Sequence, residues 1–135
     1  MIRTMARLAL STPLVVAAAL AACSDNNDSS GGLNPPPADV IIVPGAELKG
    51  FQAYSPDTLT VSLAGAPSVT VVWRNDESVS SGIQHTVTDT TAAHAFDTGA
   101  IDPGKTGSVT FTSAGSFPYK CSIHSGMRGL VVVQP

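Results

Sequence analysis

Short apolar or alternating segments, separated by turn residues about every ten positions, run from residue 39 to the C-terminus. They cover residues 40–43, 48–54, 58–63, 69–73, 83–87, 96–101, 108–112, 117–121 and 129–134. None has the length and 3.6-residue period of a helix, and this rhythm is typical of a β-sandwich or barrel. We therefore predict an all-β domain of about eight strands over residues 39–135. Segment 69–73 is continuously apolar and is expected to be central in a sheet.

The first 22 residues have the pattern of an export signal. Arg3 and Arg7 precede an apolar stretch, residues 8–22, that ends in small residues. This stretch contains Pro13 and, at about 15 residues, is short for a helix that spans roughly 30 Å of hydrocarbon. We therefore expect residues 1–22 to be a signal peptide that is removed.

The signal segment ends in Leu20-Ala21-Ala22-Cys23, which resembles the lipobox of bacterial lipoproteins. The resemblance implies that Cys23 is lipidated and becomes the first residue of the mature chain. Acyl chains would hold the protein at a membrane surface, since each buried methylene contributes about 0.8 kcal/mol. We expect a lipid-anchored protein on the periplasmic side of a bacterial membrane, and Ser24 after the cysteine favours the outer membrane. The alternative is an ordinary signal peptide beside a chance cysteine.

Residues 23–38 are expected to be a flexible tether. Leu33 is the one large apolar side chain among the Ser, Asn, Asp, Gly and Pro residues of positions 24–38. Such a segment buries too little surface to offset the entropy of ordering. Fully extended, it would reach roughly 50 Å from the anchor.

The charge balance of the chain is acidic, with a formal net charge of −3 at pH 7. Without Arg3 and Arg7, five basic residues face ten acidic ones, so the net charge is 5 − 10 = −5. There is no cluster of Lys and Arg to neutralise phosphates, and we therefore expect no nucleic acid partner. Net acidity favours a basic protein partner.

Three potential metal donors follow one another at intervals of three residues: Cys121, His124 and Met127. They lie in a predicted loop between two strands, where Gly126 would let the backbone bend. His85 faces inward in the alternation of segment 83–87 and offers a second imidazole. Two histidines and a cysteine with a weak axial methionine form the blue-copper set. The sequence therefore predicts one copper ion bound by these four donors.

Each donor also has an ordinary interpretation. His85 would be a hydrogen-bonded core residue, Cys121 an inert buried thiol, and the other two donors plain loop residues. If Cys23 carries lipid, Cys121 has no disulfide partner in the chain. The joint occurrence of the four at these spacings favours the metal site. The remaining histidine, His94, is read as a solvated loop residue.

From about residue 69 to 133 the chain resembles the cupredoxin family, and within it the small plastocyanin, pseudoazurin and amicyanin group. The segments that carry the resemblance are VTVVWRN, QHTVTD, SVTFTSAGSFPYKC and CSIHSGMRGLVVV. The C-x-x-H-x-x-M loop is similar to the short form of amicyanins. The resemblance implies a Greek-key β-sandwich with His85, Cys121, His124 and Met127 as copper ligands. Two departures are Thr86, where the family often has Asn, and Ile123, where it often has Pro.

The resulting functional hypothesis is a membrane-tethered one-electron carrier and not an enzyme. Its partners would be redox proteins, such as a cytochrome or a copper oxidase or reductase, and the edge of His124 would be the electron port. Copper enzymes need further histidine-bound copper, and only His94 remains for that role. The alternative is a periplasmic protein that stores copper or delivers it to a partner. A metal-free adhesion module is a third possibility.

Overall fold

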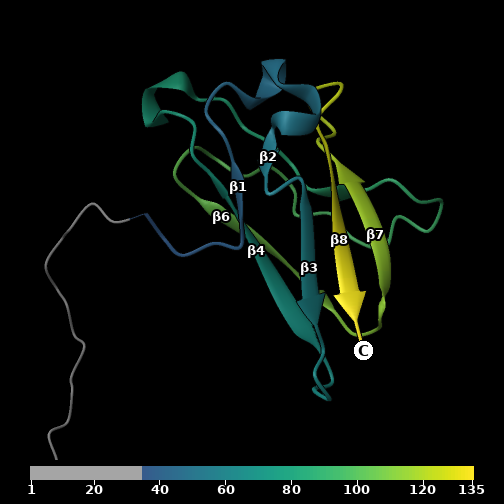
Figure 1. Ribbon diagram of the computed structural model, residues 1–135. Coiled ribbons are helices and arrows are strands. Elements are labelled where there is room, and N and C mark those ends of the chain that lie inside the picture. Colours follow the sequence, from purple (N-terminus) through teal and green to yellow (C-terminus); the bar gives the residue numbers. More distant parts are fainter. Residues whose placement is uncertain (1–34) are drawn as a thin grey trace, which may run out of the picture. The chain divides into compact units, whose positions relative to one another are not determined.

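The computed structural model describes residues 35–135 (Figure 1). The predicted signal peptide, Cys23 and nearly all of the tether lie outside the described residues. The described chain forms two four-stranded sheets, each with parallel and antiparallel pairs. The first sheet has the order β2 (Tyr54–Ser55), β1 (Val40–Ile42), β4 (Val69–Asn75) and β6 (Thr106–Phe111). The second has the order β3 (Thr58–Ser62), β8 (Arg128–Gln134), β7 (Gly115–Lys120) and β5 (Thr88–Asp89). The predicted all-β fold with eight strands is confirmed.

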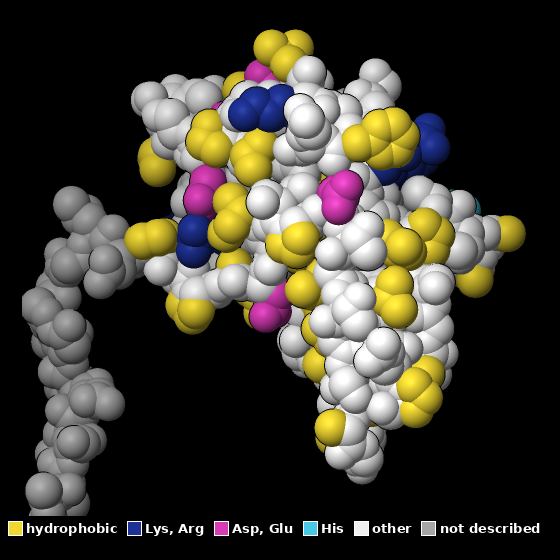
Figure 2. All heavy atoms as spheres, viewed as in Figure 1, with side chains coloured by type: hydrophobic (Ala, Val, Ile, Leu, Met, Phe, Trp, Pro, Cys, Tyr) yellow, Lys and Arg dark blue, Asp and Glu magenta, His cyan; other side chains and the backbone are white. Residues whose placement is uncertain are grey.

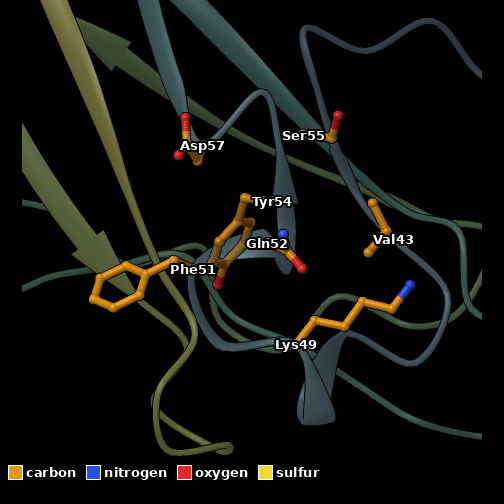
Figure 3. Close-up of a pocket in the computed structure, with 7 residues that line it drawn as sticks. All are labelled: Val43, Lys49, Phe51, Gln52, Tyr54, Ser55 and Asp57. Carbon is orange, nitrogen blue, oxygen red and sulfur yellow. The ribbon is translucent and has the colours of Figure 1, made fainter.

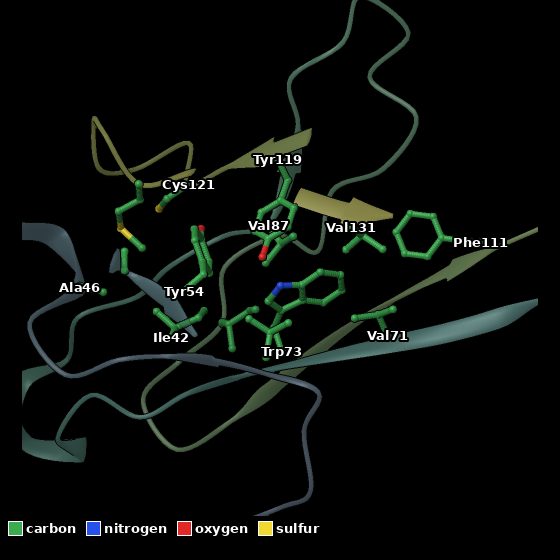
Figure 4. Packing of buried hydrophobic residues seen from close by; sticks show 14 of the residues in the cluster. Ile42, Ala46, Tyr54, Val71, Trp73, Val87, Phe111, Tyr119, Cys121 and Val131 are labelled. Carbon is green, nitrogen blue, oxygen red and sulfur yellow. The ribbon is translucent and has the colours of Figure 1, made fainter. Parts of the chain in front are cut away.

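The core lies between the two sheets, where large aromatic side chains meet. Trp73 of β4 and Tyr119 of β7 are edge to face, with ring centroids 5.4 Å apart. Tyr54 of β2 also packs edge to face on Tyr119, with ring centroids 4.9 Å apart (Figure 4). Each such pair contributes about 0.5–1.5 kcal/mol beyond its buried area. The aromatic cluster thus fixes the two sheets relative to each other.

Most predicted strands are found where the alternation placed them. The segments that became β1, β3, β4, β6, β7 and β8 differ from the prediction by a few residues at their ends. β4 lies between β1 and β6, as expected of a central strand, although its outer face is only partly covered. In β7 and just after it, Tyr119 and Cys121 are buried and Lys120 is exposed, which is the period-2 alternation of a strand.

The strand predicted at residues 48–54 is wrong. The chain there makes two 3₁₀ turns, η1 (Ala46–Leu48) and η2 (Gly50–Gln52), before the short strand β2. Gly45 and Gly50 have φ angles of 70° and 56°, in the left-handed region that interrupts an extended chain. Leu48 and Phe51 are 87% and 68% exposed, so their apolar side chains do not mark a buried face.

The strands predicted at residues 83–87 and 96–101 are also wrong. Only isolated bridges form there, between His85 and Ile101 and between Thr88 and Asp97. The alternation placed Thr86 on the face opposite His85, yet Thr86 is buried as well. Loops cover it on that side, and sequence periodicity contains no information about them.

The two 3₁₀ turns and the loop with the predicted donors lie together at one end of the sandwich. The register pairs Ile42 with Asn75 in the first sheet and Lys120 with Arg128 in the second. The turns η1 and η2 and the loop between β7 and β8 lie at this end, which is uppermost in Figure 1, and the C-terminus lies at the opposite end. Within the described residues, no helix has the length and apolar character needed to cross a membrane.

Gly129 provides a test of this packing. It lies directly opposite Tyr119 in the β7–β8 register, and an added Cβ would be 2.4 Å from the ring carbon that bears the hydroxyl. We expect Gly129→Ala to lower the free energy of unfolding by about 1–3 kcal/mol in denaturant titration, because the buried ring has to shift.

The matched control is Gly115→Ala in β7, where the added Cβ would make an ordinary contact of 3.4 Å with Phe117. Its unfolding free energy should change by less than about 1 kcal/mol. Equal effects of the two substitutions would contradict the packing described for Tyr119.

Candidate metal centre

Three of the four predicted donors converge on one point. The Nδ1 atoms of His85 and His124 are 3.2 Å apart, and the Cys121 Sγ lies 4.0 Å from the first and 3.7 Å from the second. Metal–nitrogen and metal–sulfur bonds of about 2.0–2.3 Å place three donors in a trigonal arrangement roughly 3.5–4 Å apart. The observed triangle therefore fits a single ion at its centre.

The loop between β7 and β8 delivers Cys121 and His124 to this point. Cys121 follows β7 directly, and its backbone N–H donates to the Met127 carbonyl at 3.2 Å, which closes the loop. Gly126 has a φ of 92°, a conformation that favours glycine, so its predicted role in bending the loop is confirmed. A Cβ added to Gly126 would lie 3.8 Å from the Cα of Gly50, which places turn η2 against the loop.

Met127, the fourth predicted donor, is fully buried at the end of this loop. It packs in the core cluster and also lines the recess, of about 360 Å³, that residues 120–128 form. The structure thus brings its side chain into the interior beside the loop that carries Cys121 and His124. Its position agrees with the prediction that the chain turns back after His124.

His85 enters from the segment that precedes β5. Its backbone is held by two hydrogen bonds with Ile101, of 3.2 Å and 2.7 Å. The imidazole is fully buried, with Nδ1 directed at Cys121 and Nε2 3.3 Å from the Glu77 Oε1. His85 is therefore fixed at both ring nitrogens.

Thr86 joins the His85 segment to the ligand loop. Its N–H points at the Cys121 Sγ at 3.4 Å, and its hydroxyl oxygen accepts a 2.8 Å hydrogen bond from the Ser122 N–H. Tyr54 donates to the Thr86 carbonyl at 2.7 Å. Thr86 therefore bonds the ligand loop through both its backbone and its side chain.

The environment of Cys121 favours the thiolate. Burial by itself raises the pKa of the thiol, but hydrogen bonds from His85 and from nearby backbone N–H groups more than offset this and lower the pKa to about 6. Burial lowers the pKa of His85, whereas its contacts with Cys121 and Glu77 raise it, and the net direction is upward. Since a metal binds the thiolate, the lowered thiol pKa assists metal binding at neutral pH.

Glu77 is a site residue that the sequence did not reveal. Its Oε1 accepts hydrogen bonds from the N–H groups of Gly45 (2.8 Å) and Ala46 (3.1 Å) and also faces the His85 Nε2. Burial raises the pKa of Glu77, but these hydrogen bonds lower it by more than burial raises it. The net pKa is below the usual value, so the carboxylate stays charged. A carboxylate on the distal nitrogen holds a ligating histidine in one tautomer and orientation.

Asn75 was likewise not singled out from the sequence, and it supports the segments that carry Glu77 and His85. It is fully buried, its side-chain amide donates to the carbonyls of Ile83 and Ile101 at 2.9 Å, and its oxygen accepts from the Glu77 N–H. The only sequence signal was a run of polar residues directly after an apolar strand. His94, by contrast, is exposed and outside the donor cluster, as expected.

An imidazole–thiolate–imidazole triangle at one end of a two-sheet β-sandwich defines a cupredoxin domain. The sequence profile of the copper-binding proteins of the plastocyanin/azurin family matches residues 46–134. The chain belongs to this family, whose members bind one copper ion.

Solved structures agree with this assignment. A purple cupredoxin from Nitrosopumilus maritimus is 25% identical, with a TM-score of 0.60, and the match covers 73% of this chain and 100% of that one. An oxidised amicyanin variant is 25% identical, with a TM-score of 0.54, over 80% of this chain and 88% of that one.

A copper-containing nitrite reductase from Thermus scotoductus shares the fold alone, at 23% identity and a TM-score of 0.56. That match covers 76% of this chain but only 23% of the reductase chain. No curated protein sequence matches the chain.

The contact between Glu77 and His85 leads to a second prediction. Glu77→Gln keeps an oxygen acceptor for the Gly45 and Ala46 N–H groups but removes the charge beside the His85 Nε2. We expect the affinity for copper to fall about 10–100-fold, as measured by competition with a chelator.

Asp76→Asn is the matched control, because Asp76 pairs with Arg74 and not with a donor residue. It should leave copper affinity unchanged. An equal loss in both variants would show that the effect is one of general charge and not of the bond to His85.

Proposed function

We propose that the protein is a one-electron carrier in which His85, Cys121, His124 and Met127 hold one copper ion. The observation that carries the proposal is the convergence of two imidazole nitrogens and a thiolate sulfur within 4.0 Å of one another. Met127 is buried at the end of the same loop and would supply the thioether of a blue-copper set. Copper in such a site changes reversibly between Cu(I) and Cu(II).

The protein's own contribution is to hold the donors still. Thr86 bonds both Cys121 and Ser122, Glu77 fixes the ring of His85, and the Met127 carbonyl closes the loop. Donors that keep their positions in both oxidation states favour rapid electron exchange. This support by surrounding hydrogen bonds is what a carrier requires.

His124 is the natural electron port. It is half-buried, whereas His85 and Met127 are fully buried and Cys121 is only 4% exposed. Of the four donors, only His124 thus reaches solvent to an appreciable extent. A partner that docks over the ligand loop would lie next to this ring.

Burial also separates the carrier from the copper-delivery alternative. A delivery protein passes its ion to incoming ligands, which need direct access to the metal, and three of the four donors here lie beneath the surface. An enzyme of the copper oxidase or nitrite reductase type needs further histidines, and His94 is exposed and apart from the cluster. We therefore propose that the protein is not an enzyme.

The copper spectrum tests the proposal. We expect the Cu(II)-loaded protein to show the intense visible absorption of a copper–thiolate bond and to be reduced and reoxidised reversibly. Cys121→Ser should lose the absorption band altogether.

His94→Asn is the matched control, since His94 is exposed and has a positive φ of 43° that asparagine tolerates. It should keep both the band and the copper content. A colourless product that binds no copper would overturn the site, and rapid release of Cu(I) to an acceptor protein without redox exchange would favour copper delivery.

We also propose that the domain is tethered by lipid on Cys23 to the periplasmic side of a bacterial membrane. The lipobox-like segment and the polar residues after it support this, and all of them except residues 35–38 lie outside the described residues. In a bacterial host, Cys23→Ser should prevent incorporation of labelled fatty acid and shift the protein from the membrane to the soluble fraction. An unlabelled wild-type protein would instead support an ordinary signal peptide.

A further inference from the structure

The ligand loop, residues 121–127, begins and ends next to two basic residues that are paired with each other. Lys120, the last residue of β7, is paired with Arg128, the first residue of β8, and both are exposed. Like charges directly opposite each other in a sheet are destabilising. Neither forms an ion pair within the described residues. The fold itself therefore gains nothing from this pair.

Apolar side chains lie beside the two cations. Ile123, half exposed at 50%, lines the same recess as Lys120 and Arg128. Phe51 is 68% exposed and lines an adjoining recess with Arg128 and Asp57. The contact between Gly50 and Gly126 is what brings η2, and with it Phe51, next to the ligand loop.

Phe51 lines a recess with Arg128, whereas Lys49 shares only a separate recess with Phe51 and Asp57. In Figure 3, Phe51 extends toward the ribbon of β8, while Lys49 extends from the same turn in the opposite direction. We define the docking face as Phe51, Lys120, Ile123 and Arg128. Asp57 is the one acidic residue in the two recesses that these four line.

We propose that the docking face binds an acidic redox partner, a protein that presents carboxylates around an apolar centre. This inference rests on the proposed electron-carrier function. His124, the proposed electron port, lies in the same recess as the two cations, so a partner bound there would be next to it. Aromatic and aliphatic side chains within a charged rim are typical of transient protein interfaces, and complementary charge accelerates encounter.

The inference reverses the expectation from net charge. The domain of residues 39–135 carries five basic and eight acidic residues, 5 − 8 = −3, which by itself would favour a basic partner. The charges are not spread evenly, however. Asp76 is paired with Arg74, and the carboxylates of Glu77 and Asp89 are buried, at 7% and 2% exposed. On the face shown in Figure 2, dark blue and magenta side chains both lie above the lower tip, and the tip itself shows no charged side chain. At physiological salt the screening length is about 8 Å, so local charge decides which partner docks.

The test uses two small redox reagents of opposite charge with the reduced, copper-loaded protein. Hexacyanoferrate(III) is an anion and tris(phenanthroline)cobalt(III) is a cation, and each accepts one electron from the protein in a single transfer. We expect the rate constant with the anion to fall as ionic strength rises, and the rate constant with the cation to rise or stay constant.

Lys120→Gln/Arg128→Gln should lower the rate with hexacyanoferrate at least about fivefold at low ionic strength, where screening is weak. The matched control Lys105→Gln removes an exposed cation outside the docking face and should change the rate less than about twofold. Thermal unfolding should show that the double variant is as stable as the wild type or more so, because it loses a repulsive pair.

The outcomes separate this inference from the function on which it rests. Electron exchange with both reagents, but a rate with the anion that rises with ionic strength or an equal loss in the control, would overturn the docking face and leave the carrier intact. No exchange with either reagent would overturn the carrier itself, and this inference would fall with it.

Discussion

The hydrogen bond from the Thr86 N–H to the Cys121 Sγ joins the two chain segments on which the site depends. One segment carries His85 and the other carries Cys121, and they are 36 residues apart in sequence. The Thr86 hydroxyl adds a bond to the first residue of the loop after the thiol. The distance between the Cys121 Sγ and the His85 Nδ1 spans these two segments. Contacts of the backbone therefore help to set this distance, and it does not depend on flexible side chains alone. The same N–H stabilises the thiolate that the metal requires.

The core extends this junction into the sandwich. Tyr54 bonds the Thr86 carbonyl and packs edge to face on Tyr119, which lies two residues before Cys121 in the chain. Tyr119 has room for its ring only because Gly129 is opposite. Packing between the sheets and the position of the thiolate are therefore parts of one arrangement. At the other ring nitrogen of His85, the buried charge of Glu77 is tolerated because backbone N–H groups and His85 surround it.

The sequence predicted the features that depend on local periodicity. Alternation placed His85 inward, where it is fully buried, and the spacing of Cys121, His124 and Met127 identified the loop. It failed where tertiary contacts decide. Residues 48–54 look like a strand, but left-handed glycines turn the chain and expose Phe51. Thr86 was expected to face away from His85, and Glu77 was not singled out, because burial by loops distant in sequence leaves no periodic trace.

The alternation of a strand also reconciles two demands that oppose each other in an electron carrier. The donors have to be rigid and shielded, while the surface above them has to exchange partners quickly. Where β7 ends, the two needs fall on adjacent residues: Cys121, which follows β7 directly, is buried, and Lys120, its last residue, is exposed and directly opposite Arg128. The pleat of a strand that ends at the donor cluster thus leaves the residue before the cysteine, here Lys120, facing outward. Substitutions at the outer positions can then change the partner without moving a donor, because no described hydrogen bond links the side chains of Lys120 or Arg128 to the triangle.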